Sequence, residues 1–400
     1  MRNVAVIGGG LAGLSCAHAL RDRSIPYTVF EAAEPGGRCT GATFLLGPDV
    51  YKNTFRLATS LGLREEMIAI PPIAGQYYKG KVYPHRVSSV MGLLSFKGLN
   101  LIDKAMLSRM ALLLARYGSM LDFQHPERAA PIDDENVATF VKRELTQNIL
   151  NYVAGPLIST LFFYGSEETS KVLYLNLAKH MQHTTLYTIR GGLNRLLTAL
   201  AADLKIVPSR VDSIAHADGT YVVADARFTD VVIAVPGNAV LQIGGVRDLL
   251  SGEDREFFAQ CRYGRAVTVS FNLDGFRGDC YALSIPRVEQ LSTATINFND
   301  FIDPGSVHQG NITIVGGGDA VSASDLLSDF QRIYSREPKE ATIREWSSAM
   351  PKFPPGRYRG IAAFLNRQRR PGLFFCGDYL LGPFVEGAIA TGLRAVPTAS

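Results

Sequence analysis

The chain is 400 residues long and carries a formal net charge of +4, with 46% hydrophobic and 20% charged residues. This length exceeds what one hydrophobic core usually holds, so two domains are expected, and the composition is that of a well-packed globular chain without a disordered tail. The small net charge and the absence of a lysine- or arginine-rich block exclude nucleic acid as a partner. The short group Arg367, Arg369 and Arg370 is expected to be solvated.

The first element is a glycine-rich turn between a strand and a helix. Val4–Ile7 is short and apolar, as a buried parallel strand should be. Gly8, Gly10 and Gly13 then form a G-x-G-x-x-G turn before the helical run Leu14–Arg21. In such a turn the first glycine permits the tight bend, the second lets the backbone approach a pyrophosphate, and the third lets helix and strand pack closely. The helix N-terminus offers free N–H groups and a positive dipole end to the phosphates.

A second strand, Tyr27–Glu31, ends in an acidic residue eighteen positions after Gly13. An acid at this place accepts hydrogen bonds from ribose hydroxyls. A glycine turn alone is weak evidence, because such turns are common between strands and helices. Strand, turn, helix and acid together predict that the chain begins by binding an adenine dinucleotide. Leu11 and Ala12, at the helix start, are included among the predicted contacts.

The next segments predict a hairpin and then a helical region. Residues 77–84 (YYKGKVYP) are typical of two short strands around a Lys-Gly turn. From Val87 to Tyr187 the periodicity is mostly helical, and Asp133–Glu135 is an expected helix start. Residues 90–120 combine a broad apolar face with basic residues elsewhere. Two interpretations stay open for them: the core of a helical substrate domain, or a surface that contacts a membrane peripherally and admits a lipophilic substrate. No apolar run is long enough to span a membrane.

The following segments predict a return to the first domain and then a second sheet. Residues 191–197 open a helix. Short strands are expected at 206–207, 210–214, 221–223 and 231–236, and a sheet of the second domain at 266–273, 294–298 and 311–315. The triplet Gly316–Gly318 is not followed by a helical apolar run, so it is expected to be a turn at a strand end.

The five cysteines, at positions 16, 39, 261, 280 and 376, form no C-x-x-C pair and have no histidine partners at metal-binding spacing. Such a set indicates reduced, intracellular thiols and no metal site. Because the first strand begins at residue three, no cleaved signal is expected, and a cytoplasmic location is predicted. Cys39 and Cys376 either lie near the dinucleotide or are buried as small hydrophobic residues.

The far end of the chain offers a second candidate cofactor segment. Leu373–Cys376 is another short apolar strand, and Gly377 and Asp378 end it. Residues 381–392 form a helix rich in small residues, which let it lie close to other backbone. The N-terminus of this helix can stabilise negative charge that develops on an electron-poor ring. Asp378 has an alternative interpretation as an ordinary turn or N-cap residue.

These motifs resemble those of the flavin amine oxidase superfamily. The turn Gly36-Gly37-Arg38 adds a cation that can reach the pyrophosphate, and its pairing with the first glycine turn resembles the FAD-binding signature of that superfamily. The run from Gly377 to Ala388 resembles its "GD…EGA" segment. Segments 134–170, 187–200 and 345–358 resemble protoporphyrinogen oxidases and their relatives. Since neither Cys39 nor Cys376 stands in the Gly-Gly-Cys context of covalent flavin attachment, the resemblance implies non-covalent FAD.

The resemblance also implies the roles of individual residues. Gly377 and Asp378 would lie near the ribityl and phosphate groups, and the backbone of Val385 and Glu386 would face the pyrimidine end of the flavin. The full set of predicted cofactor-binding residues is Gly8, Gly10, Leu11, Ala12, Gly13, Glu31, Gly37, Arg38, Val211, Gly377, Asp378, Val385 and Glu386.

The fold implied is α/β and two-lobed, with a Rossmann-type FAD-binding domain and a mixed helical and β-sheet substrate domain. The predicted FAD-binding domain is discontinuous and comprises residues 1–75, 188–243 and 341–400. The predicted substrate domain comprises residues 76–187 and 244–340.

The activity implied is that of an FAD-dependent oxidoreductase that removes hydride from a conjugated, largely apolar small molecule. Arg265, Tyr78 and Phe384 are the candidate residues lining its site, and Phe384 is preferred because it precedes the helix expected beneath the flavin. Other aromatic candidates for the walls are Tyr77, Tyr83, Phe162, Phe163, Tyr164 and Tyr187.

Two departures from the resembling families leave the substrate open. The stretch 74–77 has no cation where protoporphyrinogen oxidases carry an arginine, so Arg86 or Lys81 would have to substitute. Residues 264–267 contain Arg265 but no lysine of the kind many amine oxidases place near the flavin. An amine or amino-acid oxidase, a redox-neutral flavin isomerase and a flavin-binding protein without a catalytic pocket are the alternatives.

Overall fold

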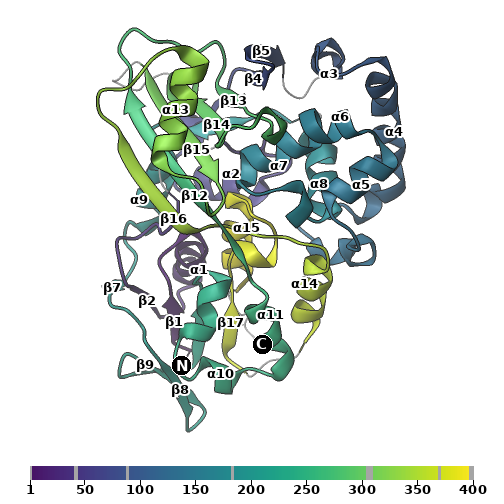
Figure 1. The fold of residues 1–400 in the computed structure, drawn as a ribbon. Helices are drawn as coiled ribbons and strands as arrows, with labels where there is room; N and C mark the ends of the chain where they lie inside the picture. Colours follow the sequence, from purple (N-terminus) through teal and green to yellow (C-terminus); the bar gives the residue numbers. More distant parts are fainter. Residues whose placement is uncertain are drawn as a thin grey trace.

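A computed structural model describes residues 2–39, 44–86, 90–181, 184–302, 310–367 and 371–395. The predicted solvated group therefore falls partly outside these residues, at Arg369 and Arg370. In Figure 1 a lobe with a parallel sheet lies below, and a second sheet covered by helix α13 lies above it beside a group of helices. This mixed α/β architecture confirms the expected fold class.

The lower lobe is built on a five-stranded parallel sheet in the order β17-β11-β1-β2-β7. These strands are β1 (Val4–Ile7), β2 (Tyr27–Glu31), β7 (Ile206–Pro208), β11 (Asp230–Ile233) and β17 (Leu373–Phe375). The sheet thus joins the start, middle and end of the chain. Its central strands are buried along their whole length, which explains why β1 and β11 are almost wholly apolar.

Two helices of this lobe pack unusually close together. The helices of the lobe are α1 (Leu11–Asp22), α2 (Lys52–Ser60), α9 (Leu193–Ala201), α10 (Val246–Leu249), α11 (Gly252–Ala259), α14 (Arg357–Asn366) and α15 (Val385–Ala395). A Cβ on Gly392 of α15 would lie 2.2 Å from the carbonyl oxygen of Ala12 in α1. Only glycine permits this approach, so the expectation that small residues bring this helix close to other backbone is confirmed.

A small antiparallel sheet, β8 (Ile214–Ala217), β9 (Thr220–Val223) and β10 (Ala226–Phe228), extends from the lobe, and a two-stranded one pairs β3 (Met67–Ala69) with β6 (Tyr187–Ile189). The predicted strand at 210–214 is wrong except for its last residue. Arg210 and Asp212 pair with each other at the exposed surface, and Ser213 makes only an isolated bridge to Gly244. A sequence pattern typical of a strand does not produce a strand where no neighbouring strand is available for hydrogen bonding.

The upper sheet has seven strands in the order β16-β12-β15-β14-β13-β4-β5. They are β4 (Ile73–Tyr78), β5 (Lys81–Arg86), β12 (Tyr263–Asn272), β13 (Ala282–Ser284), β14 (Thr293–Phe298), β15 (Asn311–Gly317) and β16 (Thr342–Pro351). The predicted hairpin of residues 77–84 is confirmed as β4 and β5, and both Lys79 and Gly80 have positive φ at its turn. One face of the sheet packs on α13 (Ala323–Tyr334) through Val267, Ile314 and Phe330.

The other face of this sheet looks toward the helical group (Figure 1). Its helices are α3 (Val90–Ser95), α4 (Leu101–Tyr117), α5 (Val137–Glu144), α6 (Gln147–Ile149), α7 (Gly155–Phe162) and α8 (Lys171–Met181), and the short α12 (Asn299–Ile302) follows β14. The predicted helix start at Asp133–Glu135 is wrong, because Asn136 caps α5. Asp133 instead accepts hydrogen bonds from the backbone N–H groups of Tyr358 and Arg359 at the start of α14, at 2.7 and 3.2 Å.

Helix α4 carries apolar side chains at its exposed surface as well as in the core. Met110 and Leu113 are buried, whereas Leu101 and Ile102 are 84% and 70% exposed. Among the described residues, no helix is long and apolar enough to cross a membrane. The division into two domains stays a prediction. Strand β16 pairs with β12 in the upper sheet, although the predicted range 341–400 assigns its residues to the FAD-binding domain.

Candidate active site

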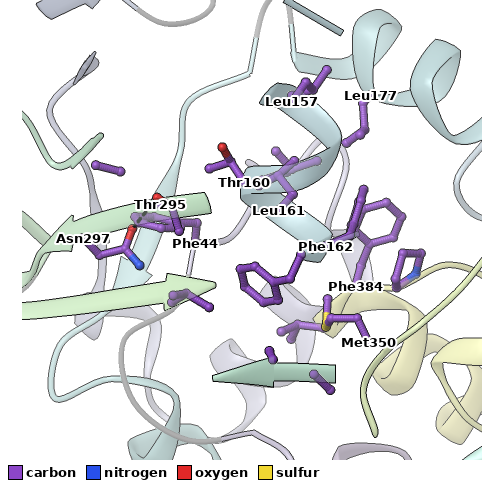
Figure 2. A pocket seen from close by; sticks show the side chains of 18 of the residues that line it. Phe44, Leu157, Thr160, Leu161, Phe162, Leu177, Thr295, Asn297, Met350 and Phe384 are labelled. Carbon is purple, nitrogen blue, oxygen red and sulfur yellow. Dashed lines mark hydrogen bonds between the residues drawn. The ribbon is translucent and has the colours of Figure 1, made fainter. Parts of the chain in front are cut away.

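A cavity of about 1360 Å³ connects the two lobes. At one end it reaches Gly8, Gly10 and Glu31, which follow or end the central parallel strands. At the other end it lies between the seven-stranded sheet and helices α7 and α8, as Figure 2 shows with Thr295 on one side and Leu157 and Leu177 on the other. The carboxyl ends of parallel strands are where open α/β sheets bind ligands.

The N-terminus of α1 borders the first end of the cavity. Gly10 is its N-cap residue, no side chain caps it, and its first turn holds no acid. A Cβ on Gly10 would meet nothing within 4 Å, so this position faces open space. A Cβ on Gly13 would instead lie 1.8 Å from the carbonyl oxygen of Gly8, and Gly13 does not line the cavity. Gly13 therefore serves the close packing of helix and strand.

Glu31 is held in place by backbone amides. Its two carboxylate oxygens accept hydrogen bonds from the N–H groups of Gly9 and Ala33. Each oxygen keeps a lone pair for a further donor, because an ionised carboxylate offers about four acceptor sites. The carboxylate is thus oriented at the cavity wall and able to accept ligand hydroxyls.

Arg38 and Asp378 bring the two distant cofactor segments together. One guanidinium nitrogen of Arg38 donates to both carboxylate oxygens of Asp378, at 3.1 and 3.0 Å, and the other donates to the carbonyl of Ala349 at 2.9 Å. The guanidinium also lies 4.9 Å from the centre of the Tyr263 ring. Burial is the largest single influence on the pKa of Arg38 and lowers it, but the charge of Asp378, the hydrogen bond to it and smaller contributions from neighbouring groups together raise the pKa overall. Arg38 is therefore a fixed cation at the cavity.

The start of α15 faces the cavity from below. Val385 and Ala388 line it together with Phe384, whose ring meets those of Phe123 and Phe162 edge-on at centroid distances of 4.8 and 5.6 Å. The side chain of Glu386 turns away from this space. Its carboxylate is buried and accepts hydrogen bonds at the start of α2, from the N–H groups of Asn53 and Thr54 and the hydroxyl of Thr54.

Three further predicted residues lie elsewhere. Val211 is partly buried, packs against the hydrophobic core and does not line the cavity. Tyr78 packs into an aromatic cluster with Phe96 and Tyr152 instead of facing the cavity. Arg265 points to the opposite face of the sheet, where it binds the carbonyls of Gly318 and Val321 and the carboxylate of Glu345. The assignment of Arg265 as a site residue is corrected: the alternation of β12 turns Ala266, its neighbour, toward the cavity.

The remaining predicted positions are placed as follows. Leu11, Ala12, Gly37, Gly377 and the aromatic residues Phe162 and Phe163 line the cavity, and Tyr77, Tyr83, Tyr164 and Tyr187 do not. Arg86 lines it and Lys81 does not. Cys39 lines it and Cys376 does not, and burial raises the pKa of the Cys39 thiol to about 12, which keeps it protonated.

Sequence reasoning missed the polar face of the upper sheet. Thr268 and Ser270 of β12 line the cavity, while Val267 and Val269 between them are buried on the other side. The period-two alternation of residues 266–271 is the signal that could have found it. Gln76 of β4 is a second missed residue; it lines the cavity and donates to the carbonyl of Tyr152 at 2.6 Å.

These features fit an adenine dinucleotide with a redox-active ring. An uncapped helix N-terminus, two positions without side chains at Gly10 and Gly37, an oriented carboxylate and a fixed cation suit a pyrophosphate and a ribose. The second helix N-terminus, at Val385, borders the apolar part of the cavity. The fold and site define a dinucleotide-dependent oxidoreductase with a substrate pocket between its two lobes.

Residues 11–397 match the family of flavin containing amine oxidoreductases, and the chain belongs to this family. It is an FAD-dependent oxidoreductase, as the resemblance implied. A coproporphyrinogen III oxidase of Mycobacterium tuberculosis is 24% identical over 466 aligned positions, which cover 99% of this chain and 96% of that protein. A coproporphyrinogen III oxidase of Staphylococcus aureus is 29% identical over 181 residues, 42% of this chain and 37% of that protein.

Solved structures share the fold across nearly the whole chain. The cyclohexylamine oxidase of Brevibacterium oxydans superimposes with a TM-score of 0.75 at 18% identity, covering 98% of this chain and 97% of that one. Because the relatives include enzymes named for porphyrinogens and for an amine, the substrate of this chain must be argued from its own cavity.

Proposed function

We propose that the protein removes hydride from a conjugated, largely apolar small molecule bound between the upper sheet and the helical group. The observation that carries this proposal is the wall opposite the sheet. Most of its cavity-lining side chains are apolar, among them Leu107, Met110, Leu157, Leu161, Phe162 and Leu177 of α4, α7 and α8, and Thr160 of α7 adds a hydroxyl. Such a wall excludes water and suits an extended apolar skeleton. Two of the relatives are named as oxidases of coproporphyrinogen III, which supports an oxidation reaction for this cavity.

The cofactor contacts follow from the geometry of the other end. We propose that the pyrophosphate lies on the N-terminus of α1 beside Gly10, that Glu31 accepts the ribose hydroxyls, and that Arg38 neutralises phosphate charge while Asp378 fixes its position. The N-terminus of α15 at Val385 would stabilise charge on the reduced ring. FAD bound there without a covalent link supplies a two-electron acceptor for the hydride.

The residues of the chain then position the substrate and exclude water. Phe384 stands at the start of α15, held by Phe123 and Phe162, and forms a rigid edge against which a flat substrate can rest. No Asp, Glu, Lys or Arg side chain lines the helical wall in the part of the chain that the structure describes. We infer that orientation over the flavin, more than a strong general base, drives the reaction.

The test is anaerobic reduction of the bound flavin by four donors: protoporphyrinogen, coproporphyrinogen, a conjugated polyene and a simple primary amine. Bleaching by a conjugated donor but not by the amine is expected. Bleaching by the amine, with hydrogen peroxide released in air, would assign an amine oxidase instead. Conversion of a donor without net flavin reduction would assign an isomerase.

We also propose that the mouth of this cavity rests on an anionic lipid surface. Met91 of α3 lines the cavity and is 71% exposed, so the cavity opens beside α3. Leu101, Ile102 and Leu112 are exposed on the neighbouring α4. The basic residues Lys97, Lys104 and Arg116 lie on or next to the same helix, and Arg109 on it is paired with Glu144. An apolar patch among basic side chains suits a bilayer with anionic headgroups.

Vesicle sedimentation tests this contact. The protein should bind vesicles of phosphatidylglycerol more than those of phosphatidylcholine, and Leu101→Asn with Ile102→Asn should reduce that binding. Ile343→Asn, at an exposed apolar residue of β16, is the matched control. Equal binding of wild type and the α4 variant would contradict the proposal.

A further inference from the structure

An arginine stands on the cavity face of the upper sheet. Arg344 of β16 lies directly opposite Thr268 of β12, and both residues line the cavity. Residues that face each other across an antiparallel pair share one face of the sheet, so the Arg344 side chain is on the same face as the Thr268 hydroxyl. That hydroxyl donates to the carbonyl oxygen of Arg344 at 3.3 Å and tethers the backbone from which the guanidinium extends.

Strand alternation separates Arg344 from the acid next to it. Glu345 is on the opposite face, where its carboxylate lies 2.8 Å from the guanidinium of Arg265. Among the described residues, no carboxylate lies within ion-pair distance of Arg344. The acidic residues of the described chain that line the cavity are Glu31 and Asp378, at the cofactor end. Arg344 thus brings to the substrate end a positive charge that these residues do not neutralise.

The charge lies at one end of an uncharged row of the sheet. From Arg344 the strand register continues across the sheet through residues that all line the cavity: Thr268, Val315, Thr295 and Ser284. Ala349, whose carbonyl holds Arg38, lies about 16 Å further along β16 at the rise of an extended strand. An anion bound to Arg344 is therefore remote from the cofactor end.

The other arginine at the substrate end of the described cavity stands at the opposite edge of the sheet. Arg86 lines the cavity from β5, but its strand partner Ile73 does not, whereas His85 and its partner Ala74 both do. Strand alternation therefore gives the cavity face to His85 and places Arg86 at the rim. Burial lowers the pKa of His85, so its ring is neutral at pH 7. A ligand on the described cavity face of the sheet meets its positive charge at Arg344.

The opposite wall supplies hydrocarbon. In Figure 2 Leu157 and Leu161 of α7 lie across from Thr295. A carboxylate that enters between the two walls loses hydration, and this cost is offset where a cation or hydrogen-bond donors replace the water. A guanidinium offers both, because its N–H groups form a planar fork that matches the two oxygens of a carboxylate.

We propose that Arg344 selects a substrate whose conjugated, apolar skeleton ends in a carboxylate. The guanidinium binds the carboxylate, and the skeleton lies between the uncharged row and the helical wall. The proposal rests on the proposed function, since it takes the same cavity as the substrate site. It adds the anionic class of the substrate and the residue that determines this specificity.

Retinoic acid and methyl retinoate form a matched pair of probes, because they share one conjugated skeleton and differ in the charge at its end. Each is titrated into the FAD-loaded protein, and binding is measured by equilibrium dialysis and by the change in the flavin spectrum. Since Arg344 is exposed and its ion pair is partly screened, the acid is expected to bind about fivefold more tightly than the ester. Equal or tighter binding of the ester, or no binding of either probe, would overturn the proposal.

Removal of single charges locates the contact. Arg344→Gln should raise the Kd of retinoic acid about fivefold and leave that of methyl retinoate unchanged. Arg332→Gln is the matched control, because Arg332 is exposed on α13, which covers the other face of the same sheet, and does not line the cavity. Undiminished binding of the acid to Arg344→Gln at full flavin content would refute the role of Arg344. A loss in Arg86→Gln instead would place the carboxylate at the other edge and equally refute it.

Binding and chemistry fail separately in this design. A preference for the acid that depends on Arg344, although no donor reduces the flavin, would support the carboxylate site and contradict the proposed function. Bleaching of the flavin by a conjugated donor, without any preference for the acid, would contradict the carboxylate site alone.

Discussion

Replacing Gly10 by valine separates cofactor binding from folding. The backbone of Gly10 has φ of −77° and ψ of −179°, which any residue adopts, and a Cβ there meets nothing within 4 Å. The free energy of unfolding of the apoprotein should therefore change by about 1 kcal/mol or less. The valine side chain would extend into the space beside the N-terminus of α1, where we place the pyrophosphate.

The expected loss of affinity is large. A backbone N–H group that donates to a phosphate oxygen contributes about 1.5–3 kcal/mol, because the acceptor is charged. If the side chain separates the phosphates from two such amides, the cost is about 3–6 kcal/mol. The Kd for FAD should then rise about 10²- to 10⁴-fold.

The assay is fluorescence titration of the apoprotein with FAD, with thermal unfolding of the apoprotein measured in parallel. Gly252→Val is the control, because Gly252 also has open space around its Cβ position but lies at the start of α11, outside the cavity. A Gly10→Val variant that binds FAD with the wild-type Kd would refute the placement of the pyrophosphate. A variant that fails to fold would refute the claim that this position faces open space.

Four other substitutions test further parts of the site. Glu31→Ala should weaken FAD binding about 10- to 100-fold by removing charged acceptors for the ribose; full flavin occupancy of the purified variant would argue against that role. Arg38→Ala leaves Asp378 without its cation. It should lower the FAD affinity, and it should lower the free energy of unfolding by about 1–3 kcal/mol; an unchanged flavin spectrum and melting temperature would exclude this role of Arg38. Phe384→Leu should slow anaerobic flavin reduction by a conjugated donor without loss of FAD, and an unaltered rate would remove Phe384 from the site. Burial raises the pKa of Cys16 from 9.0 to about 12, so the folded state favours the neutral thiol. This contribution to stability is complete below pH 9 and is lost as the pH rises toward 12. Cys16→Ala should therefore lessen the fall in melting temperature between pH 8 and pH 10, and a fall identical to that of the wild type would contradict this.

The cofactor end was predictable because its signals are local. Val4–Ile7, the glycine turn and Glu31 are contiguous elements whose geometry follows from strand, turn and helix propensity. Each was expected in its place, and the structure places Glu31 at the cavity wall beside that turn. The pairing of Arg38 with Asp378 spans 340 positions. The family resemblance implied only that each residue lies near the phosphates, and nothing in the sequence indicated that they pair.

The substrate end was less predictable because it depends on register. Arg265 and Thr268 lie three positions apart on β12 and face opposite sides of the sheet. The sequence of one strand shows that alternate residues share a face, but the neighbouring elements decide which face meets the cavity. Here α13 covers the face that carries Val267 and Val269, which leaves the hydroxyl-bearing face to the cavity. Likewise, the acid of Asp133 caps a helix more than 220 positions away, which no local pattern indicates.

The central claim is that this cavity uses FAD to oxidise a conjugated, largely apolar molecule. The most direct test is the visible spectrum of the FAD-reconstituted protein, recorded without oxygen before and after addition of a conjugated donor such as protoporphyrinogen or a conjugated polyene. The account predicts a bound-flavin spectrum that bleaches with a conjugated donor and persists with a simple amine. The absence of any flavin band after reconstitution, or a bound flavin that no conjugated donor reduces, would contradict it.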